Sequence, residues 1–489
     1  MTSSQIDVPA ASFPPLSRSG VLMGLSGGQL ALLAVPVLVV GAAFIAGDPA
    51  SAIGLFPFAV PVAAVATTSW KGRSLLSRIN ILGTYLVRRR LGQTRAVVDT
   101  SKPVEVGRIA VPGAVGERLK VLSLMSTRLP GAAMVWDRAE GTATAVLRFP
   151  TGGWHLTDPG TKRARVLAFD ELCRNLASLE GVVRLKTHAR TLPVPAAALR
   201  TGADVDVEPG REVALAEYEE LLEDPSMGMV LQRDMLMTIT VSKRAVESQV
   251  KAAGGGLAGM GEVLASRVQA IAAGLPACGV PVANAVWLGE SELRAAVRLG
   301  FDPAATEWIA QHDGALPPDA VLASMVDETL DALVTDSGVH RTWWIEDWPR
   351  SQVPAGFLAD LVGSGPFART VTQVFVPVAL HEAEKRLLRA EGSHMSVTQR
   401  NERLGRPPSS THVAEERDLV ARRDELAEGY GDVRFTGYVT VSGADEAALA
   451  SAHTWLVAHG TRLHFNPLRG QQYTAFLTSA LPLGLGPRS

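Results

Sequence analysis

Residue types that could carry nucleophilic catalysis lie side by side in the run Asp336-Ser337-Gly338-Val339-His340-Arg341. A Ser-His-Asp triad is recognised by its geometry, and residues adjacent in sequence rarely form one. The run lies at the entry of an expected strand, and Asp336-Ser337-Gly338 has the composition of a turn. Turn formation explains these residues, so the sequence predicts no catalytic residue here.

Motifs for phosphate binding are missing or lie in the wrong context. The dipeptide Gly-Lys never occurs, so no standard phosphate-binding loop is encoded and we expect no unaided ATP hydrolysis. Residues 24–28 match GxSxG but stand in an apolar run, and residues 254–259 match GxGxxG but follow no strand. The sequence therefore predicts no cofactor.

Histidine-rich motifs do not indicate a metal site either. His381-Glu382 begins like a zinc-protease helix, but lysine stands where the second imidazole is needed. His453 and His459 are six residues apart on an expected helix and point in different directions, which leaves His464 without partners. The sequence predicts no metal ligand.

The densest aromatic cluster consists of Trp343, Trp344 and Trp348, next to Glu346 and Asp347. On a strand the first two tryptophans face opposite sides, so at least one needs a second covering element. Core packing is one interpretation, and a protein-binding hot spot is the other. A third class stays open, an enzyme with a site between two lobes that uses His340, Glu346 or Asp347.

Overall charge argues against a polyanion as the main partner. Lys and Arg total 47 against 49 for Asp and Glu, a net charge of −2, so we expect no direct nucleic-acid binding. The two cysteines, Cys173 and Cys278, are too few for a disulfide framework.

The N-terminal part contains two apolar segments, Leu22 to Ala46 and Ala52 to Thr68, without ionisable residues except Asp48 between them. Each is about long enough to cross a bilayer, so we expect a transmembrane helical hairpin over residues 22–70, after a tail of residues 1–21. The anchoring side chains would include Leu22, Leu30, Val35, Val39, Phe44, Leu55, Phe58 and Val62.

A basic segment follows at residues 71–120, with eleven Lys and Arg against three acidic residues. Basic flanks stay on the cytoplasmic side, so we expect a bacterial inner-membrane protein with both termini in the cytoplasm. An amphipathic helix in this segment either lies on anionic lipid or packs as a solvated helix on the next domain. The lipid-contacting cations would be Lys71, Arg73, Arg78, Arg88, Arg89 and Arg90.

The rest of the chain alternates short strand-like runs with longer helical ones, which is typical of an α+β fold. We expect two ferredoxin-like α+β lobes, at residues 121–250 and 257–489, with Gly254-Gly255-Gly256 at the boundary. A charged helical hairpin at 380–428 is expected as an insertion in the second lobe, with helices over 380–404 and 412–428.

The order of several motifs resembles an actinobacterial family of membrane proteins encoded with conjugation-type (type IV) secretion genes. These motifs are the apolar hairpin, the basic helix, Phe301-Asp302-Pro303, the run 336–343, and the runs 466–472 and 480–484. The hairpin looks like a PrgI-type subunit, and the body is similar to the N-terminal, non-ATPase part of VirB/TraC-type secretion ATPases.

The resemblance implies a non-enzymatic inner-membrane scaffold that forms homo-oligomers and docks other channel subunits and a separate motor ATPase. The chain stops where the motor's RecA-like domain would begin, so Leu481 and Leu483 are candidate partner-binding residues together with the three tryptophans. A regulator that binds lipid surfaces through the basic helix alone is a further alternative.

Overall fold

The computed structural model describes residues 10–11, 27–45, 57, 60–63, 69–70, 73–99, 107–150, 154, 157–195, 212–223, 229–281, 284–349, 353–363, 365–403, 405, 407, 410–427, 432–460 and 462–486. The chain divides into two compact units. The first, termed the body, comprises Met1–Phe13, Thr94–Ala379 and Tyr430–Ser489. The second, termed the helical unit, comprises Pro14–Gln93 and Leu380–Gly429.

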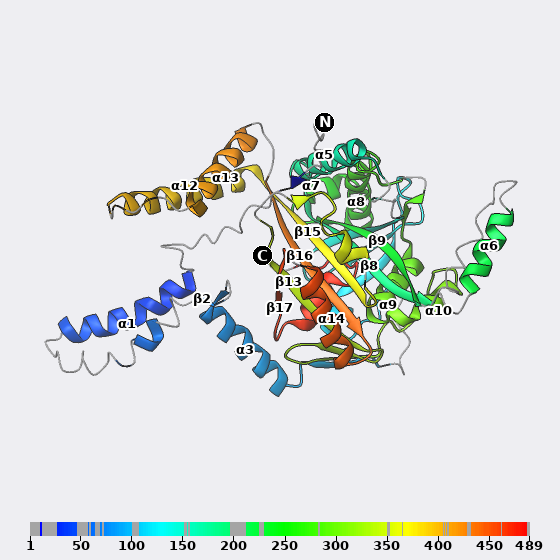
Figure 1. Ribbon diagram of the computed structural model, residues 1–489, viewed down its shortest axis with the longest axis horizontal. Helices are drawn as coiled ribbons and strands as arrows, with labels where there is room; N and C mark the ends of the chain where they lie inside the picture. Colours follow the sequence, from blue (N-terminus) through cyan, green and yellow to red (C-terminus); the bar gives the residue numbers. More distant parts are fainter. Residues whose placement is uncertain are drawn as a thin grey trace, which may run out of the picture. The chain divides into compact units, whose positions relative to one another are not determined.

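One large antiparallel sheet forms the body (Figure 1). From one edge its strands are β4 (Arg95–Val97), β11 (Met325–Glu328), β12 (Leu333–Thr335), β13 (Val339–Asp347), β16 (Asp432–Gly443), β15 (Ala368–Val378), β8 (Val182–Pro195), β9 (Met229–Ser242), β7 (Thr142–Phe149), β6 (Ala133–Asp137) and β5 (Leu119–Ser123). In addition β10 (Val286–Trp287) pairs with β7, β17 (His464–Pro467) pairs with β13, and β1 (Ala10–Ala11) pairs with β14 (Val353–Pro354).

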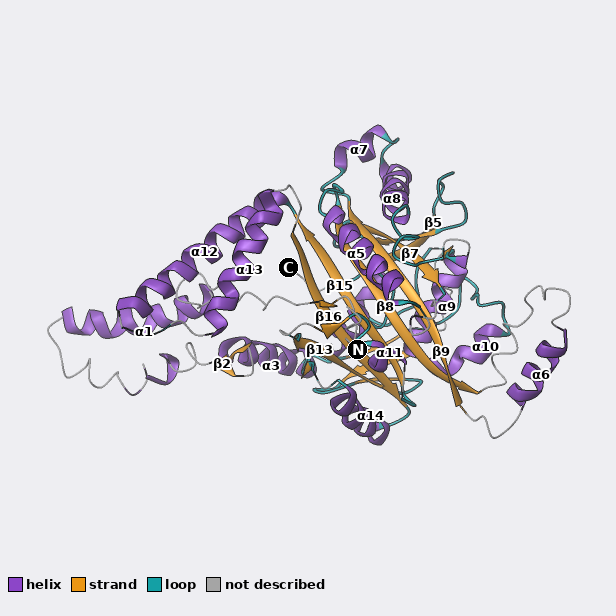
Figure 2. Ribbon diagram, turned by 45° about the horizontal axis from the view of Figure 1, so that its top comes forward, coloured by secondary structure: helices purple, strands orange, loops and turns teal. Residues whose placement is uncertain are grey.

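Helices cover the first face of the sheet. They are α5 (Pro159–Leu176), α8 (Gly256–Ala272), α11 (Ala359–Gly363) and α14 (Glu446–His459) (Figure 2). Successive side chains of a strand point to opposite faces, so Met237, Ile239 and Val241 of β9 share this side and are buried against α8 residues such as Leu264. Burial of these aliphatic side chains is the main stabilising contribution on this face.

The second face of the sheet is covered by α9 (Glu290–Phe301), by α15 (Gln472–Ser479) and by the chain that follows α15. Near β8 the core on this side contains Leu192, Phe476 and Leu481, which are at most 2% exposed. The sheet is therefore covered on both sides, as long, mostly buried strands require.

An α+β fold was predicted correctly, but two separate ferredoxin-like lobes were not. Strands from both expected lobes form one sheet, because β8 pairs with β15 from Leu185 opposite Phe375 to Thr191 opposite Arg369. The expected boundary at Gly254-Gly255-Gly256 lies between α7 (Glu247–Ala252) and α8, which contact each other.

The helical unit contains α1 (Gly27–Ile45), the short strands β2 (Ser69–Trp70) and β3 (Arg73–Ser74), α3 (Leu75–Arg90), α12 (Leu380–Arg403) and α13 (Ser410–Ala427). Helices α12 and α13 contact each other as a hairpin. They are inserted between β15 and β16 at the end of their ladder, where Val378 pairs with Asp432. Both helices lie within two residues of the ranges expected from sequence.

The transmembrane prediction is wrong: in the described parts of the chain, no helix combines the length and the apolar character needed to cross a bilayer. The same finding contradicts the predicted inner-membrane location and the cytoplasmic termini deduced from it. The prediction counted uncharged residues from Leu22 onward, whereas α1 begins only at Gly27-Gly28-Gln29 and contains Pro36. Of the second predicted segment, only residues 57 and 60–63 are described.

Candidate functional site

A line of buried polar side chains crosses the second face of the sheet. Because side chains alternate along a strand, residues 186, 188 and 190 of β8 share this face. Threonines of neighbouring strands lie beside them on the same face. Each residue of this set is at most 2% exposed. This set, termed the polar stripe, consists of Thr144, Lys186, His188, Arg190, Thr240, Thr342, Thr372 and Thr440.

Residues 478–486, termed the C-terminal strap, lie on the polar stripe. The Nζ of Lys186 donates hydrogen bonds to the carbonyl oxygens of Thr478 (2.7 Å) and Leu485 (2.8 Å). Burial lowers the pKa of Lys186 well below its ordinary value, and the nearby charge of Arg184 lowers it further. Arg184 itself donates to the carbonyl oxygen of Gly484. Two basic side chains thus hold both ends of the strap.

His188 and Arg190 hold the middle of the strap. The Nδ1 of His188 lies 2.8 Å from the carbonyl oxygen of Ser479, and burial lowers the pKa of this imidazole well below its ordinary value. The Nη2 of Arg190 donates to the carbonyl oxygen of Ala480 (3.1 Å), and its Nη1 lies 3.5 Å from Oδ2 of Asp234. Burial lowers the pKa of Arg190 to about 10, although the Asp234 charge opposes this shift.

Threonine pairs continue the polar stripe toward both sides of β8. The hydroxyl oxygens of Thr144 and Thr240 are 3.0 Å apart, and those of Thr342 and Thr440 are 2.9 Å apart. The backbone N–H of Thr342 donates to Oε1 of Gln472 at the start of α15 (2.8 Å). The chain's own C-terminal residues therefore satisfy much of this buried polar surface, which identifies it as a structural lock for the strap.

The three residues of the alternative enzyme site do not converge. His340 and Glu346 lie on the same side of β13, but six residues of strand, about 20 Å, separate them. His340 is buried against Ser442, with 2.8 Å between Nδ1 and Oγ, and burial lowers its pKa to about 4. Glu346 accepts a hydrogen bond from Asn466, whereas Asp347 is exposed. His340 is thus a neutral, buried imidazole, and its role is to pack between β13 and β16.

All three tryptophans of the aromatic cluster pack within the body. Trp343 is 1% exposed and stacks on His453, with ring centroids 5.7 Å apart. The Nε1 of Trp344 donates to the hydroxyl of Thr436 (2.9 Å). The Trp348 ring lies 4.5 Å from that of Phe435. These contacts favour the core-packing interpretation of the cluster.

The other predicted partner-binding residues, Leu481 and Leu483, are 0% and 2% exposed. Both lie in the strap and belong to the core beneath α9, where a β-carbon on Gly300 would come within 2.4 Å of Leu481. The prediction of a docking surface at these two leucines is therefore corrected, because they are already enclosed by the body.

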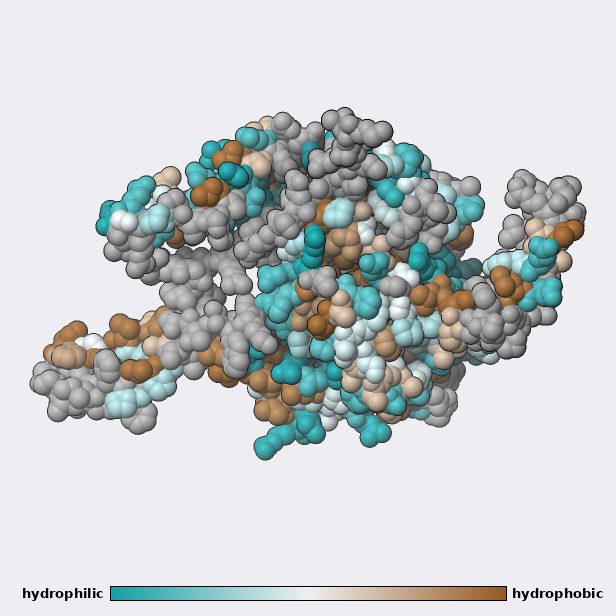
Figure 3. Space-filling view, viewed as in Figure 1, coloured by the Kyte–Doolittle hydropathy of each residue, from teal (hydrophilic) through white to brown (hydrophobic). Residues whose placement is uncertain are grey.

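Five of the predicted anchor residues are described, and three of them are exposed on α1 of the helical unit. Val35, Val39 and Phe44 of α1 are 59%, 47% and 61% exposed, and Figure 3 shows hydrophobic residues along this helix. Val62 is half-buried, and Leu30 lies within α1. Leu22, Leu55 and Phe58 lie outside the described residues.

The predicted basic residues gather at α3. Arg88, Arg89 and Arg90 form its last turn, where cations interact favourably with the helix dipole. Arg78 is half-buried on the same helix, and Arg73 lies on β3. Lys71 lies outside the described residues.

A cavity of about 420 Å³ in the body is lined by Arg298, Asp302, Trp308 and neighbouring residues. Arg298 and Asp302 pair across one helical turn, with 2.7 Å between Nη2 and Oδ2. Arg298 also donates to the carbonyl oxygen of Leu322. The charged groups of this cavity are thus engaged with each other and with the backbone.

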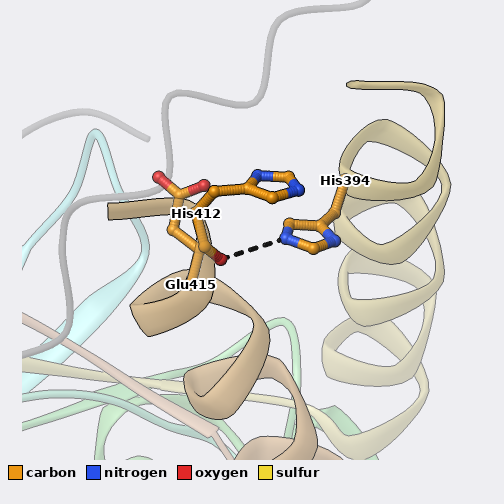
Figure 4. A group of neighbouring side chains, drawn as sticks. All are labelled: His394, His412 and Glu415. Atoms are coloured by element: carbon orange, nitrogen blue, oxygen red, sulfur yellow. Dashed lines mark hydrogen bonds between the residues drawn. The ribbon is translucent and has the colours of Figure 1, made fainter. Parts of the chain in front are cut away.

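The sequence interpretation missed one side-chain group, His394, His412 and Glu415 in the α12–α13 hairpin (Figure 4). One potential ligand atom from each residue lies within 4.8 Å of the others. The two histidines are 18 positions apart on different helices, a spacing that matches no local metal motif. The group could have been found from the sequence only by pairing the two expected helices of the hairpin, which brings His394 close to His412.

No family model matches this chain, and no curated protein sequence matches it. The resemblance to secretion proteins is therefore carried by the motifs alone.

Proposed function

We propose that this chain is a non-enzymatic assembly subunit that binds partner proteins through its helical unit. The observation that carries the proposal is the exposed apolar surface of α1. Val37, Leu38 and Ile45 are 68%, 69% and 91% exposed, in addition to Val35 and Phe44. Isolated exposed aliphatic residues are ordinary, but a series along one helix is typical of an interaction surface.

Helix α3 supports the same proposal. Ile79, Leu82 and Leu86 recur at helical spacing and are 53%, 40% and 57% exposed. The arginines of its last turn provide a cationic end. A partner with an apolar groove and an acidic rim would match this helix, because an amphipathic helix binds a groove through residues at such spacing.

The arrangement of the body supports a non-enzymatic role. His340, Glu346 and Asp347 do not converge, and the polar stripe holds the chain's own strap. Catalysis needs an acid, base or nucleophile within reach of a bound substrate. His340, Glu346 and the polar stripe serve internal contacts instead.

We infer the kind of assembly from the resemblance of the sequence motifs to those of secretion proteins. On this basis the chain is a scaffold of a type IV secretion-like or conjugation-like apparatus, it forms homo-oligomers, and it contacts other channel subunits. Its principal partner is a separate VirB/TraC-type motor ATPase. The exposed helices α1 and α3 are the proposed contact surfaces.

Co-purification of the full chain with this ATPase tests the proposal. The double variant V35D/L38D places charges on the exposed side of α1 and should lose the partner while the body keeps its stability. Leu167→Asp is the matched control, since Leu167 of α5 is as exposed (59%) as Val35 but lies in the body. Equal capture of both variants, or no capture of the ATPase by the unaltered chain, would refute the proposal.

A further inference from the structure

Two histidines and a glutamate meet where α12 contacts α13 (Figure 4). His394 comes from α12, and His412 and Glu415 come from α13. His412 and Glu415 are three residues apart and so share a side of their helix. His412 is 8% exposed, His394 is half-buried and Glu415 is exposed, so the group lies at the surface of the hairpin with one side enclosed.

The surrounding hydrogen bonds determine which nitrogen of each neutral imidazole carries the proton. The hydroxyl of Thr398 donates to the carbonyl oxygen of His394 (3.0 Å), so its oxygen accepts from Nε2 of His412, 2.8 Å away. The Nε2 of His394 donates to the carbonyl oxygen of His412, 3.3 Å away. In each neutral imidazole the proton is on Nε2, which places the ligand lone pair on Nδ1.

We propose that His394, His412 and Glu415 bind one divalent transition-metal ion, with Zn²⁺ as the preferred ion. The ligands would be Nδ1 of His412, a carboxylate oxygen of Glu415 and, once its ring has turned, Nδ1 of His394, whose Nε2 faces His412 in Figure 4. Metal-bound histidines usually donate their other ring N–H to a carbonyl or a comparable acceptor, and His412 already does so here. Two imidazoles and a carboxylate suit Zn²⁺, and water would complete a tetrahedral shell.

Binding requires a local side-chain rotation. The imidazole rings are stacked, with centroids 3.8 Å apart and an angle of 7° between their planes. A metal ion lies close to the plane of each ring that ligates it, and two parallel stacked planes do not meet. The His394 ring therefore turns about its Cβ–Cγ bond when the ion enters, so the stack and the present Nε2 hydrogen bond of this ring are lost, whereas His412 keeps its bond to Thr398.

The ion would connect the middle of α12 with the first turn of α13. Nearer the start of α12, a salt bridge between Arg423 of α13 and Glu391 of α12 already links the two helices. A bound ion adds a second link, and its stabilisation of the hairpin grows with the logarithm of the free ion concentration once this exceeds the Kd. The helices that we propose as part of an assembly subunit would then respond to metal availability, although the metal site does not depend on that function.

Isothermal titration of the tag-free full chain with ZnCl₂ tests the site. We expect one Zn²⁺ per chain, no stoichiometric binding by H394A or H412A, and weaker binding by E415Q. The variant T398V removes the acceptor for His412 Nε2, together with the hydrogen bond from Thr398 to the His394 carbonyl, and should weaken binding by about 10- to 100-fold. His381→Ala and Glu416→Gln, which alter exposed residues of the same hairpin, are matched controls and should bind as the unaltered chain does.

Cobalt provides a second readout that does not depend on the folding of a variant. Co²⁺ added to the unaltered chain should produce the visible absorption of a tetrahedral site, and Zn²⁺ should abolish it. Absence of Zn²⁺ and Co²⁺ binding by the unaltered chain overturns the proposal. Full stoichiometric binding by the folded double variant H394A/H412A also overturns it, because the ion would then lie elsewhere.

Discussion

Lys186 and Thr478 are 292 positions apart, yet the Nζ of the first donates a 2.7 Å hydrogen bond to the carbonyl oxygen of the second. The contact fixes the C-terminal strap across the middle of the sheet. Since Lys186 is fully buried, its amine has exchanged water for two backbone carbonyls. The strap therefore depends on a side chain that is costly to bury.

Replacement of Lys186 by methionine keeps an unbranched side chain that is one heavy atom shorter and removes the donor. It leaves the carbonyl oxygens of Thr478 and Leu485 without this partner, which costs about 1–3 kcal/mol for each buried group, and it relieves the desolvation of the amine. We expect a net loss of about 1–3 kcal/mol in the free energy of unfolding, measured by denaturant titration. Limited proteolysis should also cleave the strap earlier, and unchanged protection would contradict the proposed lock.

Acid should destabilise the body through His340. The folded-state pKa is about 4 because the ring is buried, whereas the ordinary value is 6.5. Between these values the unfolded chain binds a proton that the folded chain does not. Stability is therefore complete above pH 6.5 and falls as the pH decreases toward 4, by about 3 kcal/mol in total.

Denaturant titrations at several pH values check this expectation. His340→Asn should reduce the slope of stability against pH over this interval, and the remaining slope includes His188, whose pKa is shifted in the same direction. His381→Ala is the control for loss of a histidine outside the body. If the free energy of unfolding of His340→Asn depends on pH as steeply as that of the unaltered chain, His340 is not the group whose protonation destabilises the body.

Sequence reasoning predicted local elements well where one signal determined them. Aspartate is a favoured N-cap residue, and the Asp445 side chain accepts a hydrogen bond from the N–H of Ala448 as the N-cap of α14. The alternation of Met237, Ile239 and Val241 with more polar residues is typical of a strand with one apolar side, which is what β9 has. These signals involve residues only a few positions apart.

The remaining structure depends on contacts between distant residues. Lys186, His188 and Arg190 alternate along β8 as cations of a solvated face would, but the strap buries them. Only the register of β8 with β15, together with the path of the chain after α15, places them under carbonyl groups. The apolar composition around α1 likewise did not determine the residue at which the helix begins.

The close approach of the strap to the sheet should make Gly484 sensitive to any side chain. Its φ is +71°, and a β-carbon there would meet the Thr144 hydroxyl at 2.0 Å. Gly314 is the matched control, with φ +70° and no atom within 4 Å. Gly314→Ala should cost about 1–2 kcal/mol from backbone strain alone. Gly484→Ala should cost about 1–3 kcal/mol more, as measured by thermal unfolding, because steric overlap adds to the strain.

Trp343 distinguishes core packing from partner binding in the aromatic cluster. Replacement by alanine removes a side chain that is 1% exposed, so we expect a loss of about 3–5 kcal/mol in the free energy of unfolding. Trp308, which is 48% exposed, is the control, and Trp308→Ala should cost less than about 1 kcal/mol. The folded fraction of Trp343→Ala should still capture the partner ATPase, because the proposed contact surface lies on α1 and α3. Loss of capture with little loss of stability would instead place the partner at the tryptophans.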